Sequence, residues 1–325
     1  MTRFQAASIV AVAATFGVAS APFQQPQRQT FRAGTDVVTI TAFVRQGNLT
    51  VPGLTASDFI VTDNGVRQTV TVIPGEAVPF DLTIVLDLSG SVECMLDNLR
   101  RQVREVAALL RADDRLRVVT FSDKIVDVFG FLPGDAELPV DSLQAGPLTP
   151  LYDAMAMTLM RVRPAERGQL VVLLTDGEDT SSTFTLDQVR EIALRSEDVF
   201  HLFIVHGSPV RAFEKCEDLH TNANKRGFWY PEQADYIPGG PGIEGGFPTQ
   251  IMGDIARVTG GAMSEIFERD HIPGDLRQAI DDLRASYILQ YTVQGVDPKG
   301  RHKLNVKIDR PGDYSIRARR EYEGG

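Results

Sequence analysis

The sequence predicts an α/β protein in which a doubly wound, mostly parallel sheet is inserted between two β-rich ends. Short apolar runs rich in β-branched residues, such as 82–86 and 170–174, indicate strands buried on both faces. Segments whose apolar residues are spaced three and four apart alternate with these runs and indicate amphipathic helices. Both ends of the chain show alternating apolar residues without helical periodicity. Short connections between the central segments favour the doubly wound arrangement.

The first 21 residues have the pattern of a secretory signal peptide. Arg3 supplies a positive charge, residues 6–18 form an uncharged apolar core, and residues 19–21 have the small-x-small form of a cleavage site. We therefore expect an exported protein, periplasmic or secreted, with no transmembrane segment in the mature chain. The Gln- and Pro-rich residues 22–33 predict a flexible mature N-terminus.

Two alternatives to cleavage after Ala21 stay open. Pro22 would directly follow that cut, and signal peptidases tolerate proline poorly at this position. Cleavage after Ala19 is one alternative, and retention of the segment as an N-terminal anchor is the other. The short apolar core favours cleavage.

The two β-rich ends, 34–78 and 286–321, are predicted to form one β-sandwich. The candidate strands are 35–44, 58–63, 66–73, 287–293, 303–308 and 314–318. Asn64-Gly65 is a strong signal for a two-residue hairpin turn. Because neither end holds enough strands for a stable sheet, we expect the ends to pair with each other. Two unrelated β flaps are the alternative.

The central segment, 79–285, alternates strands and helices. The candidate strands are 82–86, 116–121, 125–131, 170–175, 199–205 and 263–267, and the candidate helices are 92–110, 151–162, 186–196, 251–258 and 276–286. The tight turn at 122–124 predicts that one of the two strands it joins is an antiparallel edge.

Oxygen-bearing side chains follow two of these strands and precede one helix. Asp87, Ser89 and Ser91 follow the strand at 82–86, Thr149 precedes the helix at 151–162, and Asp176 follows the strand at 170–175. Ligands of open α/β sheets bind outside the carboxyl ends of the strands, so we expect these side chains to meet there. Oxygen ligands suit a hard cation such as Mg²⁺, Mn²⁺ or Ca²⁺.

This pattern, Asp87-x-Ser89-x-Ser91 with Thr149 and Asp176, resembles the metal ion-dependent adhesion site of the von Willebrand factor type A family. The resemblance covers about residues 79–285 and implies the Rossmann-like domain of that family. It implies that the three hydroxyls bind the metal directly and that the two carboxylates bind it directly or through water. It also implies that a partner protein supplies a carboxylate to an open coordination position, as in cell adhesion.

The flanking segments are similar to those of bacterial exported proteins related to this family. The matching residues are 54–59 and 63–65 before the central segment and 287–291 after it. Near the site, we interpret Glu178 as a solvated acidic residue, Asp179 as a solvated residue or helix cap, and Asp153 as a residue that supports the site or the helix start.

Two further features lie close to the expected metal edge. Cys94 and Cys216 both project to this rim, and export would place them in an oxidising setting, so a disulfide between them is a hypothesis. Two unpaired cysteines are the alternative. A long connection, 207–248, contains Phe228, Trp229 and Tyr230, which would either anchor a partner or pack onto the domain.

Composition and motifs narrow the function classes. The net charge of -10 argues against nucleic acid as a partner. We predict no enzymatic activity, because the sequence has neither a nucleophile elbow nor a phosphate-binding glycine loop. A metal-assisted hydrolase is an alternative that would need a general base from the long connection, which offers Glu214, Glu217, Asp218 and His220. A metal that only stabilises the sheet rim is another.

Overall fold

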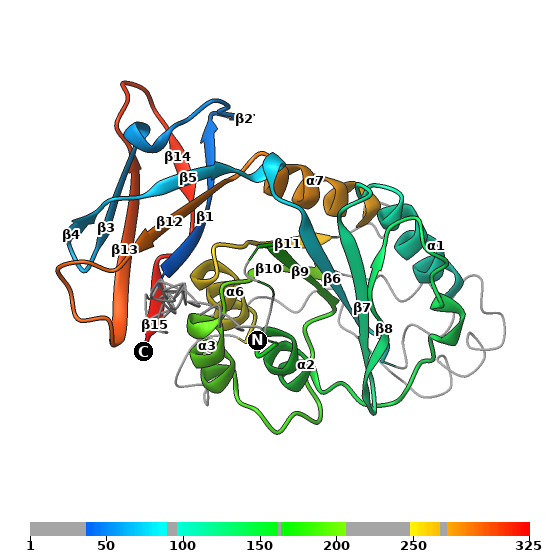
Figure 1. Ribbon diagram of the computed structural model, residues 1–325. Helices are drawn as coiled ribbons and strands as arrows, with labels where there is room; N and C mark the ends of the chain where they lie inside the picture. Colours follow the sequence, from blue (N-terminus) through cyan, green and yellow to red (C-terminus); the bar gives the residue numbers. More distant parts are fainter. Residues whose placement is uncertain (1–36, 90–95, 162–163, 165, 206–247, 267–271) are drawn as a thin grey trace, which may run out of the picture. The chain divides into compact units, whose positions relative to one another are not determined.

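A six-stranded sheet is formed by the central part of the sequence (Figure 1). The computed structural model describes residues 37–89, 96–161, 164, 166–205, 248–266 and 272–325. The sheet has the order β11-β10-β9-β6-β7-β8. Its strands are β6 (Phe80–Asp87), β7 (Arg115–Phe121), β8 (Ile125–Pro133), β9 (Gly168–Thr175), β10 (Val199–Val205) and β11 (Met263–Ile266). All neighbours pair in parallel except β7 and β8, which confirms the predicted antiparallel edge.

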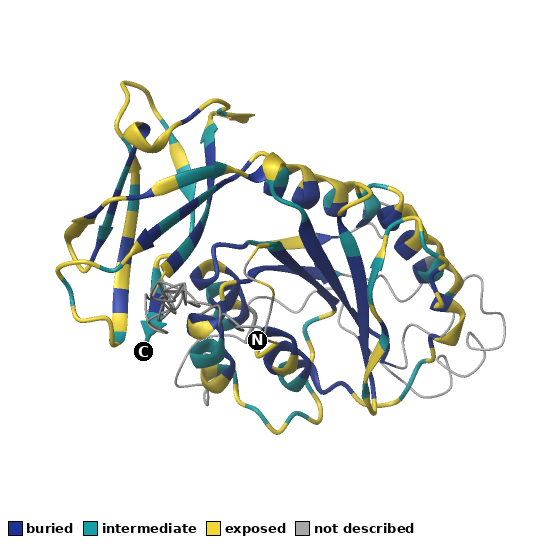
Figure 2. Ribbon diagram, in the orientation of Figure 1, coloured by how far each residue is buried: buried dark blue, intermediate teal, exposed yellow. Residues whose placement is uncertain are grey.

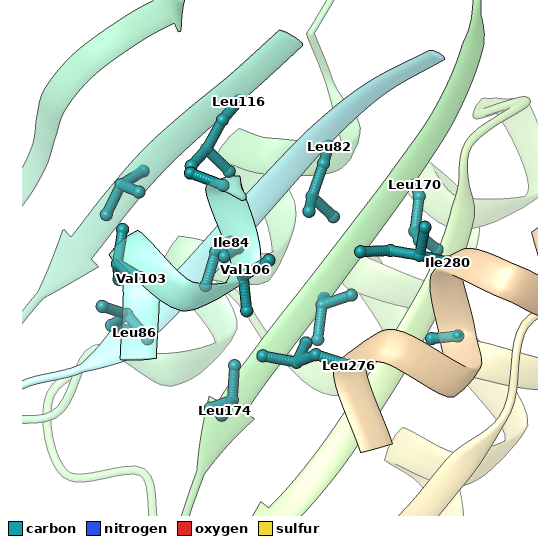
Figure 3. Packing of buried hydrophobic residues seen from close by; sticks show 14 of the residues in the cluster. Leu82, Ile84, Leu86, Val103, Val106, Leu116, Leu170, Leu174, Leu276 and Ile280 are labelled. Carbon is teal, nitrogen blue, oxygen red and sulfur yellow. The ribbon is translucent and has the colours of Figure 1, made fainter. Parts of the chain in front are cut away.

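Helices cover both faces of this sheet. One apolar cluster joins β6 to α1 (Leu96–Ala107) and α7 (Ile272–Arg284). A second joins the opposite face to α2 (Leu151–Leu159), α3 (Leu186–Arg195) and α6 (Pro248–Val258). Side chains of a strand point alternately to its two faces, so Leu82, Ile84 and Leu86 all face α1 and α7 (Figure 3). Figure 2 shows the central strands buried along their length while the helices expose one side.

Strands from the two ends of the chain pair with each other. One sheet has the order β14-β1-β12-β5, with β2 on β1, and the other has the order β15-β13-β3-β4. The strands are β1 (Val37–Gln46), β2 (Leu49–Thr50), β3 (Phe59–Asp63), β4 (Val66–Gln68), β5 (Thr71–Pro74), β12 (Tyr287–Thr292), β13 (Gly300–Ile308), β14 (Ser315–Arg317) and β15 (Glu321–Gly324). N-terminal β1 and β3 pair antiparallel with C-terminal β12 and β13, and residues of both sheets share one apolar cluster.

The prediction of a single strand at 66–73 was wrong. The structure has two strands, β4 and β5, which lie in different sheets. Between them Val70 is buried in the core, and the Gln68 side chain donates to the backbone oxygens of Val66 and Gln294. Because Gln68 and Val70 are both buried, the alternating pattern continues across the change of sheet.

A further strand, β15, is not indicated by the sequence pattern, and it extends the β-rich end beyond residue 321. Its short Glu-Tyr-Glu-Gly sequence lacks a β-branched run. The strand pairs with β13, and the buried Tyr322 donates from its hydroxyl to Asp63 Oδ2 at 2.8 Å. Tertiary contacts, among them the Tyr322 hydrogen bond and a hydrogen bond from Arg301 to Glu323, therefore hold a strand that local propensity does not indicate.

A buried polar network connects four strands of the β-rich ends. Asp63 Oδ2 accepts from the hydroxyls of Tyr291 and Tyr322, both at 2.8 Å. His302 Nδ1 lies 2.8 Å from Asp63 Oδ1, and its ring stacks on Tyr322. The Asp63 and His302 side chains are fully buried. These contacts join N-terminal β3 to C-terminal β12, β13 and β15.

Residues Asp36–Gly325 form one compact unit. Within the described ranges, no helix combines the length and the apolar character needed to cross a bilayer. The predicted signal peptide and N-terminal segment, residues 1–33, lie outside the described residues.

Candidate metal centre

Asp87 ends the central strand β6, and its side chain is buried at the carboxyl edge of the sheet. The residue is 8% exposed. Its Oδ1 accepts a hydrogen bond from the Ser89 backbone N–H at 2.9 Å, and its Oδ2 accepts one from Thr175 Oγ1 at 2.7 Å. Burial raises the pKa of Asp87, and the nearby Asp176 carboxylate raises it further. The folded chain therefore holds a carboxylate where its negative charge is poorly solvated.

The next strand, β9, places Asp176 beside Asp87. The two strands pair in parallel with Leu86 opposite Leu174, so both end at the same edge. Thr175 Oγ1 also accepts from the Gly177 N–H at 3.0 Å, and Gly177 has a φ of 90°, which favours glycine. Asp176 is exposed, and its Oδ1 accepts from the Glu178 N–H at 3.1 Å. The turn that follows β9 thus starts directly beside Asp87 and carries a second carboxylate, that of Asp176.

Ser89 is held against the loop that leads to Thr149. The Gly146 N–H donates to the Leu88 carbonyl at 3.0 Å, and Ser89 and Gly146 form a parallel bridge. A Cβ at Gly146 would overlap Asp123 Oδ1 and lie 2.7 Å from Ser122 Oγ. Glycine therefore permits this close approach of the loop to the end of β6.

Thr149 is bound to the segment that follows Asp176. Its N–H donates to Thr180 Oγ1 at 2.8 Å, and its carbonyl accepts from the Thr180 N–H at 2.9 Å. Thr149 is 5% exposed. Among the described residues, none forms a hydrogen bond with the Thr149 hydroxyl.

The structure thus links four of the five residues predicted to bind metal. Backbone or side-chain hydrogen bonds connect the segments of Asp87, Ser89, Thr149 and Asp176 at one edge of the sheet. The fifth residue, Ser91, lies outside the described residues, as do Cys94, Cys216 and the aromatic residues Phe228, Trp229 and Tyr230. Their proposed roles remain predictions.

The donor set fits a hard divalent cation. In the described part of the chain, neither Asp87 nor Asp176 forms an ion pair with a basic side chain. No group of three or more His, Cys, Asp or Glu side chains with metal-binding geometry occurs among the described residues. The candidate ligands are therefore two carboxylates and several hydroxyls, and oxygen ligands of this kind suit Mg²⁺, Mn²⁺ or Ca²⁺.

Sequence reasoning missed Thr175, although it directly precedes Asp176. A threonine at the end of an apolar strand is a common β residue, and nothing local distinguishes its hydroxyl from that of any other strand threonine. Its partner, Asp87, is 88 residues away in the sequence. The only available signal was the expectation that β6 and β9 end side by side.

Several solved structures of known proteins are similar to this chain at low sequence identity. No protein-family model matches the sequence, and a comparison with curated proteins found no match. The chain is similar to solved structures of von Willebrand factor A domains. A von Willebrand factor type A protein from Catenulispora acidiphila is 10% identical, with a TM-score of 0.45, over 89% of this chain and 75% of that chain. The mussel byssus protein PTMP1, described with a zinc-occupied MIDAS (metal ion-dependent adhesion site) motif, is 13% identical, with a TM-score of 0.47, over 70% of this chain and 51% of that chain. The conserved hypothetical protein BatB from Bacteroides thetaiotaomicron is 14% identical, with a TM-score of 0.40, over 63% of this chain and 98% of that chain.

Proposed function

We propose that this protein binds a divalent cation and, through it, a partner protein. The ligands would be Asp87, Ser89, Ser91, Thr149 and Asp176, and Mg²⁺ is the cation we expect, with Mn²⁺ or Ca²⁺ as alternatives. The observation that carries the proposal is the Asp87 carboxylate, which is buried beside Asp176 without an ion pair among the described residues. Burying a charge is costly unless it is paired or coordinates a metal, so a cation would offset this cost.

The composition of the ligand set supports the protein-binding role. Only two of the five proposed ligands carry a negative charge, because the others are neutral hydroxyls. A divalent cation held this way keeps its attraction for a further anionic oxygen. When bound, the cation would act as an electrophilic contact for a carboxylate of the partner. The chain's own residues would hold the cation at the sheet edge, where a partner can reach it.

We place this site in a von Willebrand factor type A domain at 79–285, flanked by the sandwich segments 34–78 and 286–321. The predicted signal at 1–21 supports a role outside the cytoplasm, as an adhesion or scaffold protein. In this proposal the protein is not an enzyme, and the domain presents a metal-dependent docking site.

A chelator-controlled capture experiment tests the proposal. Immobilised wild-type protein is incubated with extracts of the exporting cells in Mg²⁺, in EDTA, and in EDTA followed by excess Mg²⁺, and captured proteins are identified by mass spectrometry. An Asp87→Asn variant, which keeps the side-chain volume, is the matched control. We expect partners that bind wild type only with Mg²⁺, do not bind the variant, and are displaced by acetate.

Two results would oppose the proposal. Capture that is the same in EDTA and by Asp87→Asn would contradict a metal-dependent site. A wild-type protein that Mg²⁺ stabilises, but that captures nothing in a Mg²⁺-dependent way, would favour a metal that only stabilises the sheet rim.

A further inference from the structure

The N-terminus of α2 is capped by residues that come later in the chain. The first amides of a helix have no partners within the helix. The residue before α2 is Pro150, which provides no side-chain cap. Instead, the Tyr152 N–H donates to Asp179 Oδ1 at 3.3 Å, and the Asp153 N–H donates to Ser182 Oγ at 3.1 Å. The cap of α2 is therefore built from the segment that follows Asp176.

The Asp153 side chain, which lies on α2, also binds the later segment. Its Oδ1 accepts from the N–H groups of Thr183 and Phe184, both at 2.8 Å. Within the segment, Ser182 Oγ donates to Asp179 Oδ1. Hydrogen bonds therefore join the start of α2 to residues 179–184, and side chains from both segments take part in them. All of the residues in these contacts lie in the part of the chain that the structure describes.

Thr180 extends the network to the proposed ligand Thr149. The backbones of the two residues are joined by the Thr180 N–H donating to the Thr149 carbonyl at 2.9 Å. A second bond uses the Thr180 side chain, whose Oγ1 accepts from the Thr149 N–H at 2.8 Å. Both polar backbone groups of Thr149 are thereby satisfied by one residue, and its hydroxyl has no hydrogen-bond partner among the described residues.

We infer that Asp153, Asp179, Thr180 and Ser182 are positioning residues for the cation site. They join the segment that carries Thr149 to the segment that carries Asp176, and so fix the distance between two proposed ligands before a cation arrives. This inference rests on the proposed function, because it concerns the same site. Residues that orient metal ligands typically change metal affinity when they are mutated, by about 10–100-fold.

The alternative is that these residues only stabilise α2, and the chain offers a matched control for it. Thr185 caps α3 in the usual way, with its side chain accepting from the Gln188 N–H at 3.3 Å. No proposed ligand lies on α3. Thr180→Val and Thr185→Val therefore remove one threonine hydroxyl each from a helix-capping region, but only Thr180→Val acts on the proposed site. Thr180→Ser keeps the hydroxyl and should restore the wild-type behaviour.

The test measures cation affinity and local opening in the full chain. Mn²⁺ binding is measured by isothermal titration calorimetry for wild type, Thr180→Val, Thr180→Ser and Thr185→Val. We expect Thr180→Val to weaken Mn²⁺ binding by about 10–100-fold, Thr180→Ser to bind like wild type, and Thr185→Val to lower the melting temperature without changing the affinity. Hydrogen exchange in EDTA should show faster exchange of residues 146–153 in Thr180→Val alone.

Each remaining outcome overturns a specific statement. The positioning role would be overturned if Thr180→Val bound Mn²⁺ with wild-type affinity. It would also be overturned if Thr185→Val weakened Mn²⁺ binding as much as Thr180→Val does. Either result would leave the metal site intact. A wild-type protein that does not bind Mn²⁺ would overturn the metal site itself, and the positioning role with it. Unchanged exchange of residues 146–153 in Thr180→Val would show that Thr180 does not hold this segment.

Discussion

Thr175 Oγ1 donates a hydrogen bond to Asp87 Oδ2 at 2.7 Å, which joins the carboxyl ends of β9 and β6. The same oxygen accepts from the Gly177 N–H at 3.0 Å. One buried hydroxyl therefore orients the Asp87 carboxylate and fixes the turn that carries Asp176. This contact couples the two acidic residues of the candidate metal centre without any cation.

Removing the Thr175 hydroxyl should destabilise the protein. In Thr175→Val, Asp87 Oδ2 loses its partner while the side chain stays buried, which costs about 1–3 kcal/mol. Urea denaturation in EDTA measures the free energy of unfolding. Thr175→Ser keeps the hydroxyl and should remain close to wild type. Equal stability of Thr175→Val and wild type would show that this bond does not support the fold.

Gly146→Ala should disturb the loop that leads to Thr149. An added Cβ would lie 2.7 Å from Ser122 Oγ and 2.9 Å from Ser122 Cβ. Overpacking of this kind costs about 1–3 kcal/mol, and we expect it to reduce the stabilisation by Mg²⁺ as well. Thermal unfolding with and without Mg²⁺ checks both effects. Gly130→Ala is the control, because nothing lies within 4 Å of its added Cβ. The prediction fails when both variants behave alike.

The buried His201 side chain should cause the protein to lose stability in mild acid. Burial lowers the pKa of His201 to about 3, and the Arg317 guanidinium adds to this effect. Since the unfolded chain would bind this proton at its ordinary pKa near 6.5, the contribution of the neutral imidazole is complete above that pH. It should decrease by about 1.4 kcal/mol per pH unit as the pH falls from about 6.5 towards 3.

A variant without a titrating group at this position checks the assignment. Urea denaturation of wild type and His201→Gln between pH 4.5 and 7.5 compares their pH slopes, with the variant expected to have the shallower slope below pH 6.5. Parallel slopes would mean that His201 is protonated as easily in the folded protein as in the unfolded one.

Asp63 should be essential to the β-rich ends. Asp63→Ala would leave the buried hydroxyls of Tyr291 and Tyr322 without their shared acceptor, and it would remove the Asp63 contact of the His302 ring. Each buried hydroxyl donor left without an acceptor is expected to cost about 1–3 kcal/mol. Asp97→Ala is the comparison, because its side chain is 94% exposed and its ion pair with Arg100 should contribute less than about 1 kcal/mol. Chemical denaturation measures both, and a small effect of Asp63→Ala would contradict the role of this network.

The central sheet could be predicted because its strands are apolar on both faces. Runs such as 82–86 and 199–205 are short, apolar and rich in β-branched residues, which favours strands of a buried sheet, and β10 has the predicted bounds. The positions of Asp87 and Asp176 followed from strand ends alone. The switch between β4 and β5 was not predictable, because the alternating pattern is the same on both sides of Val70 while the partner strands change.

The contacts that support the candidate site could also not be predicted from the local sequence pattern. Thr180 and Ser182 lie in a polar run that has the composition of an ordinary loop. Their partners, Thr149 and Asp153, are 31 and 29 residues earlier in the chain. The sequence predicts that Asp153 supports the site or the helix start and that Asp179 is solvated or caps a helix, and the structure gives each a specific contact with a backbone N–H of the other segment.

The response of thermal stability to a divalent cation tests the central claim most directly. A ligand that binds only the folded state stabilises it by about 2.7 kcal/mol at a concentration 100 times its Kd. We expect Mg²⁺ or Mn²⁺ to raise the melting temperature of wild type, and to leave those of Asp87→Ala and Thr149→Ala unchanged from their values in EDTA. An equal rise in all three proteins would contradict a cation site formed by these residues.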